Sequence, residues 1–166
     1  VLRRMKRGYT IEEYRAMHAR AIDSIPGLTV TSDFIVGFCG ETAMEFQATC
    51  DLVRDLRFKN SFIFKYSERP NTKSTELFID DVPDAVKRHR NNELLAIQNA
   101  ISESDNQPFI GRDVEILVEG PSKVAAQQDN TSRIMQLTGR TRCDRIVVFP
   151  GGRQHIGQIL PIRIDD

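Results

Sequence analysis

Three stretches in the first hundred residues carry apolar side chains at the spacing of one helical face. Two of them follow capping-box motifs, Thr10–Glu13 and Thr42–Glu45, in which the first and fourth side chains bond to each other's free backbone amides. The first stretch stops at Pro26-Gly27, a dipeptide that ends helices. We therefore expect three helices, over residues 11–25, 43–56 and 83–101.

Two segments between these helices are rich in β-branched and aromatic residues. Residues 28–38 surround the single charged residue Asp33, and residues 61–66 alternate aromatic side chains with others, so both predict strands, the first of them buried. The polar segment 67–75 is expected to be a loop. The order αβαβα is typical of a parallel sheet covered by helices. Two strands are too few to bury such a sheet, so we interpret the chain as a fragment that lacks an N-terminal part.

The hydrophobic pattern changes near residues 106–108, where apolar and charged side chains begin to alternate. Residues 114–118 have the two-residue period of a strand. Three more strands, separated by glycine-containing turns, are expected at residues 134–138, 145–149 and 156–164. The polar segment 123–132 has neither period and is expected to be a flexible loop. An all-β module of about sixty residues is the size of a small OB-like barrel.

Overall charge predicts no partner, because the 23 basic and 23 acidic residues balance. Residues 1–20, however, hold six Lys and Arg against two Glu, and residues 132–157 hold five Arg against one Asp. Two local excesses favour anionic ligands at these places, whereas solvated surface charge would explain either one taken singly. No apolar run is long enough for a membrane span, and no signal peptide is evident. We expect a cytoplasmic, monomeric protein.

The three cysteines, Cys39, Cys50 and Cys143, are too few and too scattered for a disulfide framework. None of them belongs to a C-x-x-C pair or to another cluster with the spacing of metal ligands. We interpret them as reduced thiols that fill space in the core or at the surface. No metal site is expected in this chain.

The segment Asp33–Thr42 ends the first expected strand, and parallel-sheet proteins bind their ligands at the carboxyl ends of strands. Gly37 and Gly40 would let the backbone approach a ligand closely, and the helix after Thr42 directs its amides toward the same space. Asp33 in an apolar strand needs a partner. That partner is either a ligand hydroxyl or ammonium group or the neighbouring backbone amides, and spacing alone favours neither.

Several segments resemble the radical-SAM methylthiotransferases. TSDFIVGFCGET closely resembles their T-D-I/F-I-V-G-F-P-G-E-T signature, VLRRMKRGYT is similar to the helix after their fourth barrel strand, and FKYSERPNT is similar to their F-K-Y-S-x-R-P-G-T loop after the sixth. VEGPSK and LTGRTRCDRIVVF resemble the C-terminal TRAM domain of the MiaB branch, the tRNA methylthiotransferases. The resemblance implies an α/β fold, with part of a (β/α) radical-SAM barrel over residues 1–106 and a small OB-like TRAM barrel over residues 107–166.

The resemblance also implies an activity. Such a transferase cleaves S-adenosylmethionine at a 4Fe–4S cluster and adds a 2-methylthio group to N6-isopentenyladenosine next to the anticodon, so its partner is the anticodon stem-loop of tRNA. A second cluster helps supply the sulfur. Carried over residue by residue, Arg7 matches a basic residue that pairs with the S-adenosylmethionine carboxylate, Asp33 a polar residue near the ribose and Ile35 an apolar contact to the adenine. A guanidinium suits the first role because it binds a carboxylate through two parallel hydrogen bonds.

The chain departs from the family pattern in ways that affect catalysis. The C-x-x-x-C-x-x-C motif that binds the radical cluster is absent, as is the N-terminal domain with its three cysteines. Cys39 stands where the family usually has proline, and Asn71 where it usually has glycine. One cysteine cannot hold an iron–sulfur cluster without partners, so we interpret Cys39 as a proline substitute. The fragment alone is therefore expected to be inactive.

The basic stretch of the all-β module offers phosphate contacts but few aromatic side chains, since Phe149 is the only aromatic residue between positions 110 and 166. Such a surface would bind RNA by shape and backbone more than by stacked bases. A purely structural role for these arginines is the alternative. The expected RNA contacts are Arg133, Arg140, Arg142, Arg145 and Arg153.

Two other functions stay open. One is a stand-alone, non-catalytic RNA-binding protein, which a start codon at Met5 would favour, whereas an upstream in-frame C-x-x-x-C-x-x-C motif would favour the enzyme. The other is a methylthiotransferase that acts on an aspartate of a ribosomal protein. The segments LTGRTRCDR and YSERPNT favour tRNA, because the protein-modifying branch usually differs there.

Overall fold

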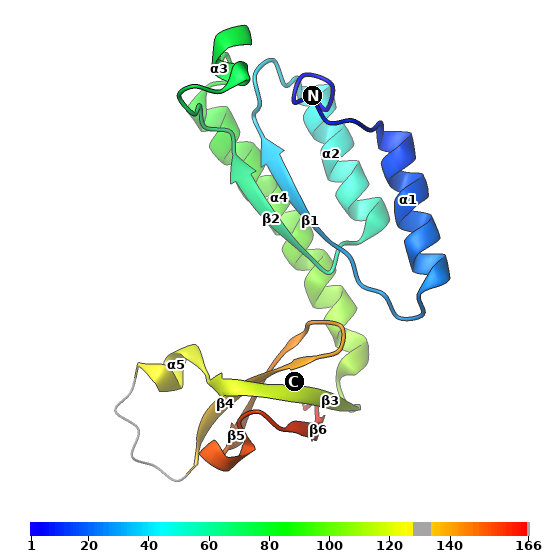
Figure 1. The fold of residues 1–166 in the computed structure, drawn as a ribbon, viewed down its shortest axis with the longest axis vertical. Helices are drawn as coiled ribbons and strands as arrows, with labels where there is room; N and C mark the ends of the chain where they lie inside the picture. The colour runs from blue at the N-terminus through cyan, green and yellow to red at the C-terminus, as the bar shows by residue number, and fades with distance from the viewer. Residues whose placement is uncertain (128–133, 166) are drawn as a thin grey trace. The chain divides into compact units, whose positions relative to one another are not determined.

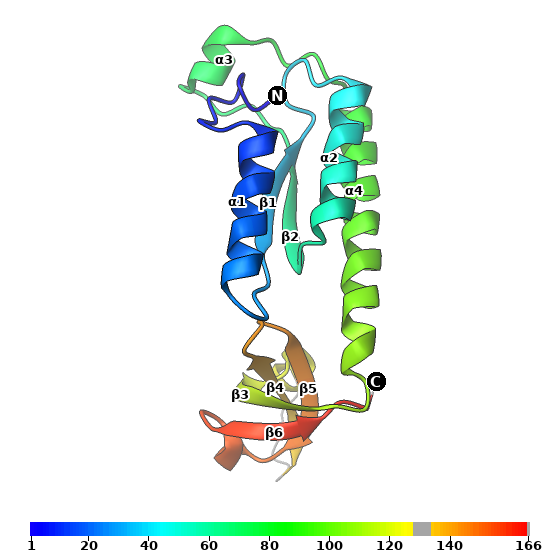
Figure 2. The same cartoon turned by 90° about the vertical axis from the view of Figure 1, so that its right-hand side faces the viewer.

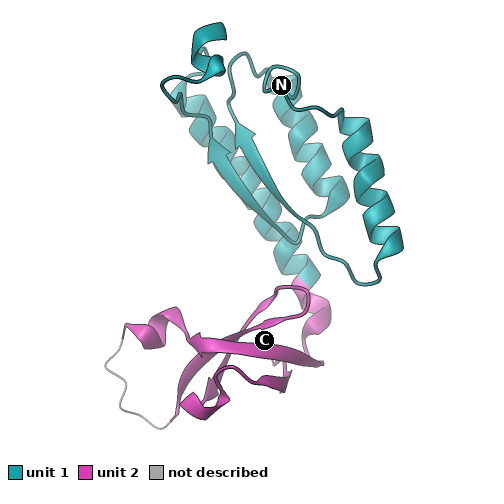
Figure 3. Ribbon diagram, viewed as in Figure 1, with its two compact units in different colours: residues 1–105 teal, residues 106–166 magenta. Residues whose placement is uncertain are grey.

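The computed structural model describes residues 1–127 and 134–165. The chain forms two compact units, residues 1–105 and residues 106–166, which Figure 3 colours separately. Each unit has its own cluster of buried apolar side chains. Each therefore has the core that an independent domain needs.

The first unit is a two-stranded parallel sheet with helices packed along it (Figure 1). Asp33 lies opposite Phe62 in the register of the two strands, and Ile35 lies opposite Phe64. The predicted αβαβα order is present, and one further short helix occupies the end of the segment for which the sequence predicts a loop. The elements are α1 (Ile11–Ser24), β1 (Thr31–Val36), α2 (Ala43–Leu56), β2 (Asn60–Lys65), α3 (Lys73–Leu77) and α4 (Asp84–Asn106).

Both predicted capping boxes are formed. The Thr10 hydroxyl accepts a hydrogen bond from the Glu13 amide at 3.2 Å, and the Glu13 carboxylate accepts one from the Thr10 amide at 2.7 Å. Thr42 and Glu45 make the same pair of bonds, at 3.2 Å and 2.9 Å. A cap of this kind contributes about 0.5–2 kcal/mol to stability. The caps fix where α1 and α2 begin, and the start of α2 sets the end of the loop that follows β1.

One face of the parallel sheet is covered and the other is open. Val36 of β1 lies in the core with Phe58 and with Leu94 of α4, and Figure 2 shows α2 and α4 together along one side of the sheet. On the opposite face Phe62 and Phe64 are 61% and 53% exposed and stack on each other. The strand β1 thus differs from the buried strand that the sequence predicts, because only alternate side chains face the core.

The second unit is a curled four-stranded antiparallel sheet with the strand order β5-β4-β3-β6 (Figure 1). Its core contains Ile116, Leu137 and Phe149. A register shift between Val118 and Gly120 marks a bulge in the first of its strands, and bulges increase the local twist. The four predicted strands are all found, at β3 (Asp113–Pro121), β4 (Met135–Thr141), β5 (Ile146–Gly151) and β6 (Ile159–Arg163).

Short helices complete the described part of the second unit. The helix α5 (Lys123–Ala126) begins the segment for which the sequence predicts a loop, and the Ser122 hydroxyl caps it by accepting a hydrogen bond from the Ala125 amide at 3.1 Å. Residues 128–133 of that predicted loop lie outside the described residues. The 3₁₀ turns are η1 (Gln107–Phe109) and η2 (Arg153–His155). Within residues 1–127 and 134–165, no helix is both long and apolar enough to cross a membrane.

Candidate ligand-binding site

The loop after β1 has a backbone that only glycine tolerates at one position. Gly37 has a φ of +73°, and a Cβ built on it would lie 2.4 Å from the Cγ of Lys87 on α4. Any larger residue would need both a rarely populated backbone conformation and a displaced lysine. The side chain of Lys87 is itself held by Asp80, whose Oδ1 lies 2.6 Å from Nζ. The loop is thus packed directly against α4.

A buried ion pair fixes the same loop. The Glu41 carboxylate accepts hydrogen bonds from the Gly37 amide and from Arg90 Nη1, both at 2.7 Å, and Arg90 also donates to the Glu41 carbonyl at 3.0 Å. The side chains of Glu41 and Arg90 are only 3% and 10% exposed. Buried charges are tolerated when they are paired and hydrogen-bonded, as here. The Gly40 amide donates to Asp81 at 2.6 Å, so several contacts hold the loop in one conformation.

Sequence reasoning does not find these loop contacts. In the sequence Glu41 is only one letter of a motif, and Arg90 and Lys87 are only polar positions of a long helix. Forty-nine residues separate Glu41 from Arg90, and no local pattern links them. The only signal in the sequence is that Arg90 lies on a helix with an apolar face, so its side chain can be near the core.

The three predicted S-adenosylmethionine contacts line one pocket. Arg7, Asp33 and Ile35 all contribute to a cavity of about 540 Å³ in the first unit. The pocket lies at the edge of β1 that has no neighbouring strand among the described residues, so residues from both faces of the strand reach it. Phe34 and Phe64 add apolar walls. The pocket thus combines a guanidinium, a carboxylate and apolar surface.

The N-terminal segment forms part of this pocket and is joined to α2 at Glu45. Arg4 Nη2 donates to the Glu45 carboxylate at 3.2 Å and to the Gly40 carbonyl at 3.1 Å. Partial burial opposes the charged form of Glu45, but hydrogen bonds from the Thr42 amide and Arg4 favour it, so the pKa of this carboxyl lies below its usual value. Glu45 thus links the loop, the cap of α2 and residues 1–4.

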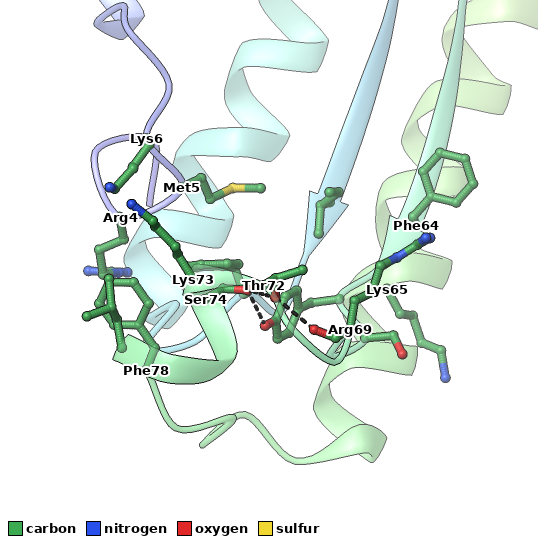
Figure 4. A pocket seen from close by; sticks show the side chains of 15 residues that line it. Arg4, Met5, Lys6, Phe64, Lys65, Arg69, Thr72, Lys73, Ser74 and Phe78 are labelled. Carbon is green, nitrogen blue, oxygen red and sulfur yellow. Dashed lines mark hydrogen bonds between the residues drawn. The ribbon is translucent and has the colours of Figure 1, made fainter.

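A second pocket of about 530 Å³ opens at the carboxyl ends of β1 and β2 (Figure 4). It shares Met5, Ile35 and Phe64 with the first pocket. Most of its remaining wall comes from the residues after β2, including α3, and Arg4, Lys6 and Phe38 also contribute. In this wall Thr72 Oγ1 lies 3.0 Å from Ser74 Oγ. Sequence reasoning places no site in this segment. The signal available is its basic residues, which a loop interpretation treats as surface charge.

The cysteines do not fit an iron–sulfur cluster. Cys39 and Cys50 are buried in the first unit, and Cys143 belongs to the second. Burial raises the pKa of the Cys50 thiol to about 11, which disfavours the thiolate that iron requires. Among the described residues no three His, Cys, Asp or Glu side chains are grouped so as to hold a metal ion.

The predicted RNA contacts differ in how free their guanidinium groups are. Arg140 is bound by Glu119 at 2.9 Å and by Asp144 at 2.5 Å, and the hydrogen bond to Asp144 together with both negative charges raises its pKa above its usual high value. Arg145 packs 4.2 Å from the Phe109 ring centroid and donates to Asn106 at 3.0 Å. Arg142 is exposed.

Two predicted RNA contacts remain. Arg153 is exposed and lies in η2. Arg133 lies outside the described residues. Among the described arginines of this set, only Arg142 and Arg153 are exposed without an ion pair to a carboxylate of the described chain. They are therefore the two whose charge is most available to a phosphate.

The class of the second unit follows from its sequence and its sheet. Residues 107–166 match the family model of the TRAM domain, and a curled antiparallel sheet is consistent with an OB-like fold of that kind. The second unit is therefore a TRAM domain.

The whole chain is similar to tRNA-modifying enzymes. It is 58% identical over 166 residues, 100% of the chain, to the tRNA-2-methylthio-N(6)-dimethylallyladenosine synthase of Rhodopirellula baltica. The enzymes of the same name from Bordetella petrii and Moorella thermoacetica are 43% identical over 166 residues and 40% identical over 164 residues. The chain covers 35%, 33% and 35% of these three relatives, about a third of their length. The predicted resemblance to the tRNA methylthiotransferases is confirmed.

Proposed function

We propose that this chain is the C-terminal part of a radical-SAM tRNA methylthiotransferase, which adds a 2-methylthio group to N6-isopentenyladenosine next to the anticodon. The observation that carries the proposal is the 58% identity to the Rhodopirellula baltica synthase over all 166 residues. This identity extends through both units, so it includes the loop after β1 as well as the TRAM domain. The proposed substrate is the anticodon stem-loop of tRNA.

The pocket at the edge of β1 is proposed to bind S-adenosylmethionine. Arg7 would pair with the carboxylate through charge-assisted hydrogen bonds, and Asp33 would accept hydrogen bonds from ribose hydroxyl groups. Ile35 would contact the adenine. When bound, S-adenosylmethionine supplies the methyl group of the product. The ion pair of Glu41 and Arg90 would keep the adjoining loop in place while the ligand binds and leaves.

The open sheet face supports a (β/α) barrel for residues 1–106. Parallel sheets are ordinarily covered on both faces, yet Phe62 and Phe64 are exposed, and neither outer edge of the β1–β2 pair has a partner strand among the described residues. Further strands on both edges would turn this face toward the inside of a barrel. Binding sites of such barrels lie at the carboxyl ends of the strands, where the second pocket is found.

The iron–sulfur clusters of the proposed enzyme are assigned to the part of the protein outside these 166 residues, since the cysteines present do not fit a cluster. The fragment alone is therefore proposed to be inactive. The TRAM domain, residues 107–166, is proposed to bind tRNA through Arg133, Arg140, Arg142, Arg145 and Arg153. We propose that Arg142 and Arg153 contribute most to tRNA affinity. Arg140 would have to break its ion pairs with two carboxylates to bind a phosphate, and Arg145 would have to leave the Phe109 ring.

The alternatives are less well supported. All three relatives described above are named as tRNA-modifying synthases, which favours tRNA over a ribosomal-protein aspartate. A stand-alone RNA-binding protein would not need the pocket that we propose for S-adenosylmethionine at the edge of β1. We propose, further, that the enzyme is a cytoplasmic monomer.

Binding of S-adenosylmethionine to the complete, cluster-reconstituted enzyme tests the site. We expect Arg7→Ala and Asp33→Ala each to weaken binding by about tenfold to a hundredfold, the effect of removing a charge-assisted hydrogen bond of about 1.5–3 kcal/mol. Arg20→Ala, which removes an exposed charge of α1 away from the pocket, is the matched control and should leave affinity unchanged. If Arg7→Ala and Asp33→Ala both bind S-adenosylmethionine as tightly as the wild-type enzyme and Arg20→Ala do, the proposed site is wrong.

A further inference from the structure

The second pocket has five basic residues in its described wall and no acidic one. They are Arg4, Lys6, Lys65, Arg69 and Lys73, and the neighbouring Glu68 and Glu76 do not line it. Figure 4 shows the side chains of Lys6 and Lys73 together on one side of the pocket and Arg69 on the other side, near Lys65 and Phe64. Gathering like charges around one cavity raises the free energy of the protein unless an anion enters. The pocket therefore has the electrostatic character of an anion site.

Two of these charges are already neutralised and three are not. Arg4 pairs with Glu45, and Lys65 Nζ lies 2.9 Å from Asp84 Oδ1. Lys6, Arg69 and Lys73 have no ion pair with any carboxylate among the described residues 1–127 and 134–165. All three are exposed, so a ligand from solvent can reach them. Guanidinium and ammonium groups both bind phosphate oxygens, so these three residues suit successive phosphates of a nucleic-acid strand.

Aromatic side chains stand beside these charges. Tyr66, Phe38 and Phe78 line the pocket, and Phe38 contacts both other rings at centroid distances of 4.9 Å and 6.0 Å. Phe64, which is 53% exposed, lies at the border with the first pocket. Basic groups next to exposed aromatic surface are the combination with which proteins hold single-stranded nucleic acids, through phosphates and stacked bases.

We infer that Lys6, Arg69 and Lys73 form a subsite for the phosphates of a single-stranded RNA segment, with Phe64 contacting an adjoining base. The inference rests on the proposed function, since tRNA is the RNA that would enter. The subsite is a second place of RNA contact, and it lies in the first unit and not in the TRAM domain. The subsite borders the proposed S-adenosylmethionine pocket through Met5, Ile35 and Phe64. A nucleotide held there would bring its strand to the edge of that pocket.

The test maps binding residue by residue on the 166-residue chain. Amide NMR spectra of the ¹⁵N-labelled chain are recorded during titration with single-stranded oligouridylate, and in a parallel titration with inorganic phosphate. We expect the RNA to shift the amides of Lys6 and of residues 69–78. In the Arg69→Gln/Lys73→Gln double variant these shifts should require at least about tenfold more RNA, and the log–log salt slope should fall by about 0.7 for each phosphate that is no longer neutralised. Arg20→Gln, which removes an exposed charge of α1, should change neither.

Each other outcome has a defined meaning. Shifts confined to residues 134–165 would overturn the subsite while leaving RNA binding by the TRAM domain intact. An unchanged double variant would overturn it as well. Equal affinity for inorganic phosphate and for the oligonucleotide would replace the RNA assignment with a free-phosphate site. The reaction product of the complete enzyme is measured separately, so failure of the subsite and failure of the proposed function are distinguishable.

Discussion

Single residues of the first unit determine whether the loop after β1 can adopt its conformation. Gly37 supplies a positive φ and leaves room for Lys87, while Glu41 and Arg90 pair in a nearly water-free position. Substitution at Gly37 and removal of Arg90 lower the free energy of unfolding for different reasons. A methyl group at Gly37 adds strain and a clash, whereas removal of Arg90 leaves a buried carboxylate without its countercharge.

Gly37→Ala separates the clash from the backbone strain when it is compared with Gly27→Ala. Both glycines have a φ of +73°, but a Cβ on Gly27 has no neighbour within 4 Å. Gly27→Ala should therefore lower the free energy of unfolding by about 1–2 kcal/mol, the cost of a left-handed backbone. Gly37→Ala should cost about 1–3 kcal/mol more, because Lys87 has to move. Urea unfolding of the chain measures both, and equal decreases would show that α4 does not pack against the loop as described.

Arg90→Met tests the buried ion pair against an exposed one on the same helix. The variant should be less stable by about 3–5 kcal/mol, because Glu41 stays buried without a countercharge. Arg88→Met removes an arginine that pairs with Asp84 at the surface, and should cost less than about 1 kcal/mol. If the two variants unfold at the same urea concentration, the pair of Arg90 with Glu41 does not hold the loop.

At the scale of elements, local sequence patterns are sufficient to predict helices and strands, but they do not show which elements pack together. The capping boxes, the strand periods and the change of pattern near residue 106 all depend on neighbouring residues, so the sequence predicts the helices and strands within a few positions. The short helices α3 and α5 escape prediction because each covers too few residues to show a period. The open face of β1 and the basic pocket escape it as well, since they depend on which elements pack together.

The cap of α2 gives a pH-dependent prediction. The pKa of Glu45 in the folded chain lies below its ordinary 4.5, so its stabilising contribution is complete above about pH 4.5 and is lost as the pH falls through the lowered pKa. The difference in unfolding midpoint between the chain and its Glu45→Gln variant should therefore shrink over this interval. A difference that stays constant down to pH 2 would mean that the carboxylate charge contributes nothing to the folded state.

At the scale of the whole molecule, the second unit has the properties of an independent domain. It has its own core around Ile116, Leu137 and Phe149, and its family match begins at residue 107. The candidate sites divide in the same way, with both pockets in the first unit and the predicted RNA-binding arginines in the second. The sequence can predict this division from its two periodicities, but it cannot rank the arginines, because their carboxylate and ring partners are brought together only by the fold.

The TRAM domain should bind tRNA mainly through its unpaired arginines. In the 166-residue chain, Arg142→Ala/Arg153→Ala should lower tRNA affinity and reduce the log–log salt slope by about 0.7–0.9 for each phosphate that the variant leaves without a cation. Arg140→Ala should have a smaller effect on both, since Glu119 and Asp144 already neutralise this arginine. Fluorescence titrations at several salt concentrations give both quantities. A larger effect of Arg140→Ala than of the double variant would contradict this ranking.

The tRNA nucleosides made by the complete enzyme decide whether the proposed function is right. The full reading frame that contains this chain would be expressed in a bacterial strain that lacks tRNA methylthiotransferase activity, and the nucleosides of its tRNA would be analysed by mass spectrometry. We predict that N6-isopentenyladenosine is converted to its 2-methylthio derivative, and that Arg7→Ala/Asp33→Ala strongly reduces this conversion while Arg20→Ala does not. Unmodified N6-isopentenyladenosine in the presence of the folded, cluster-loaded wild-type enzyme would contradict the proposal.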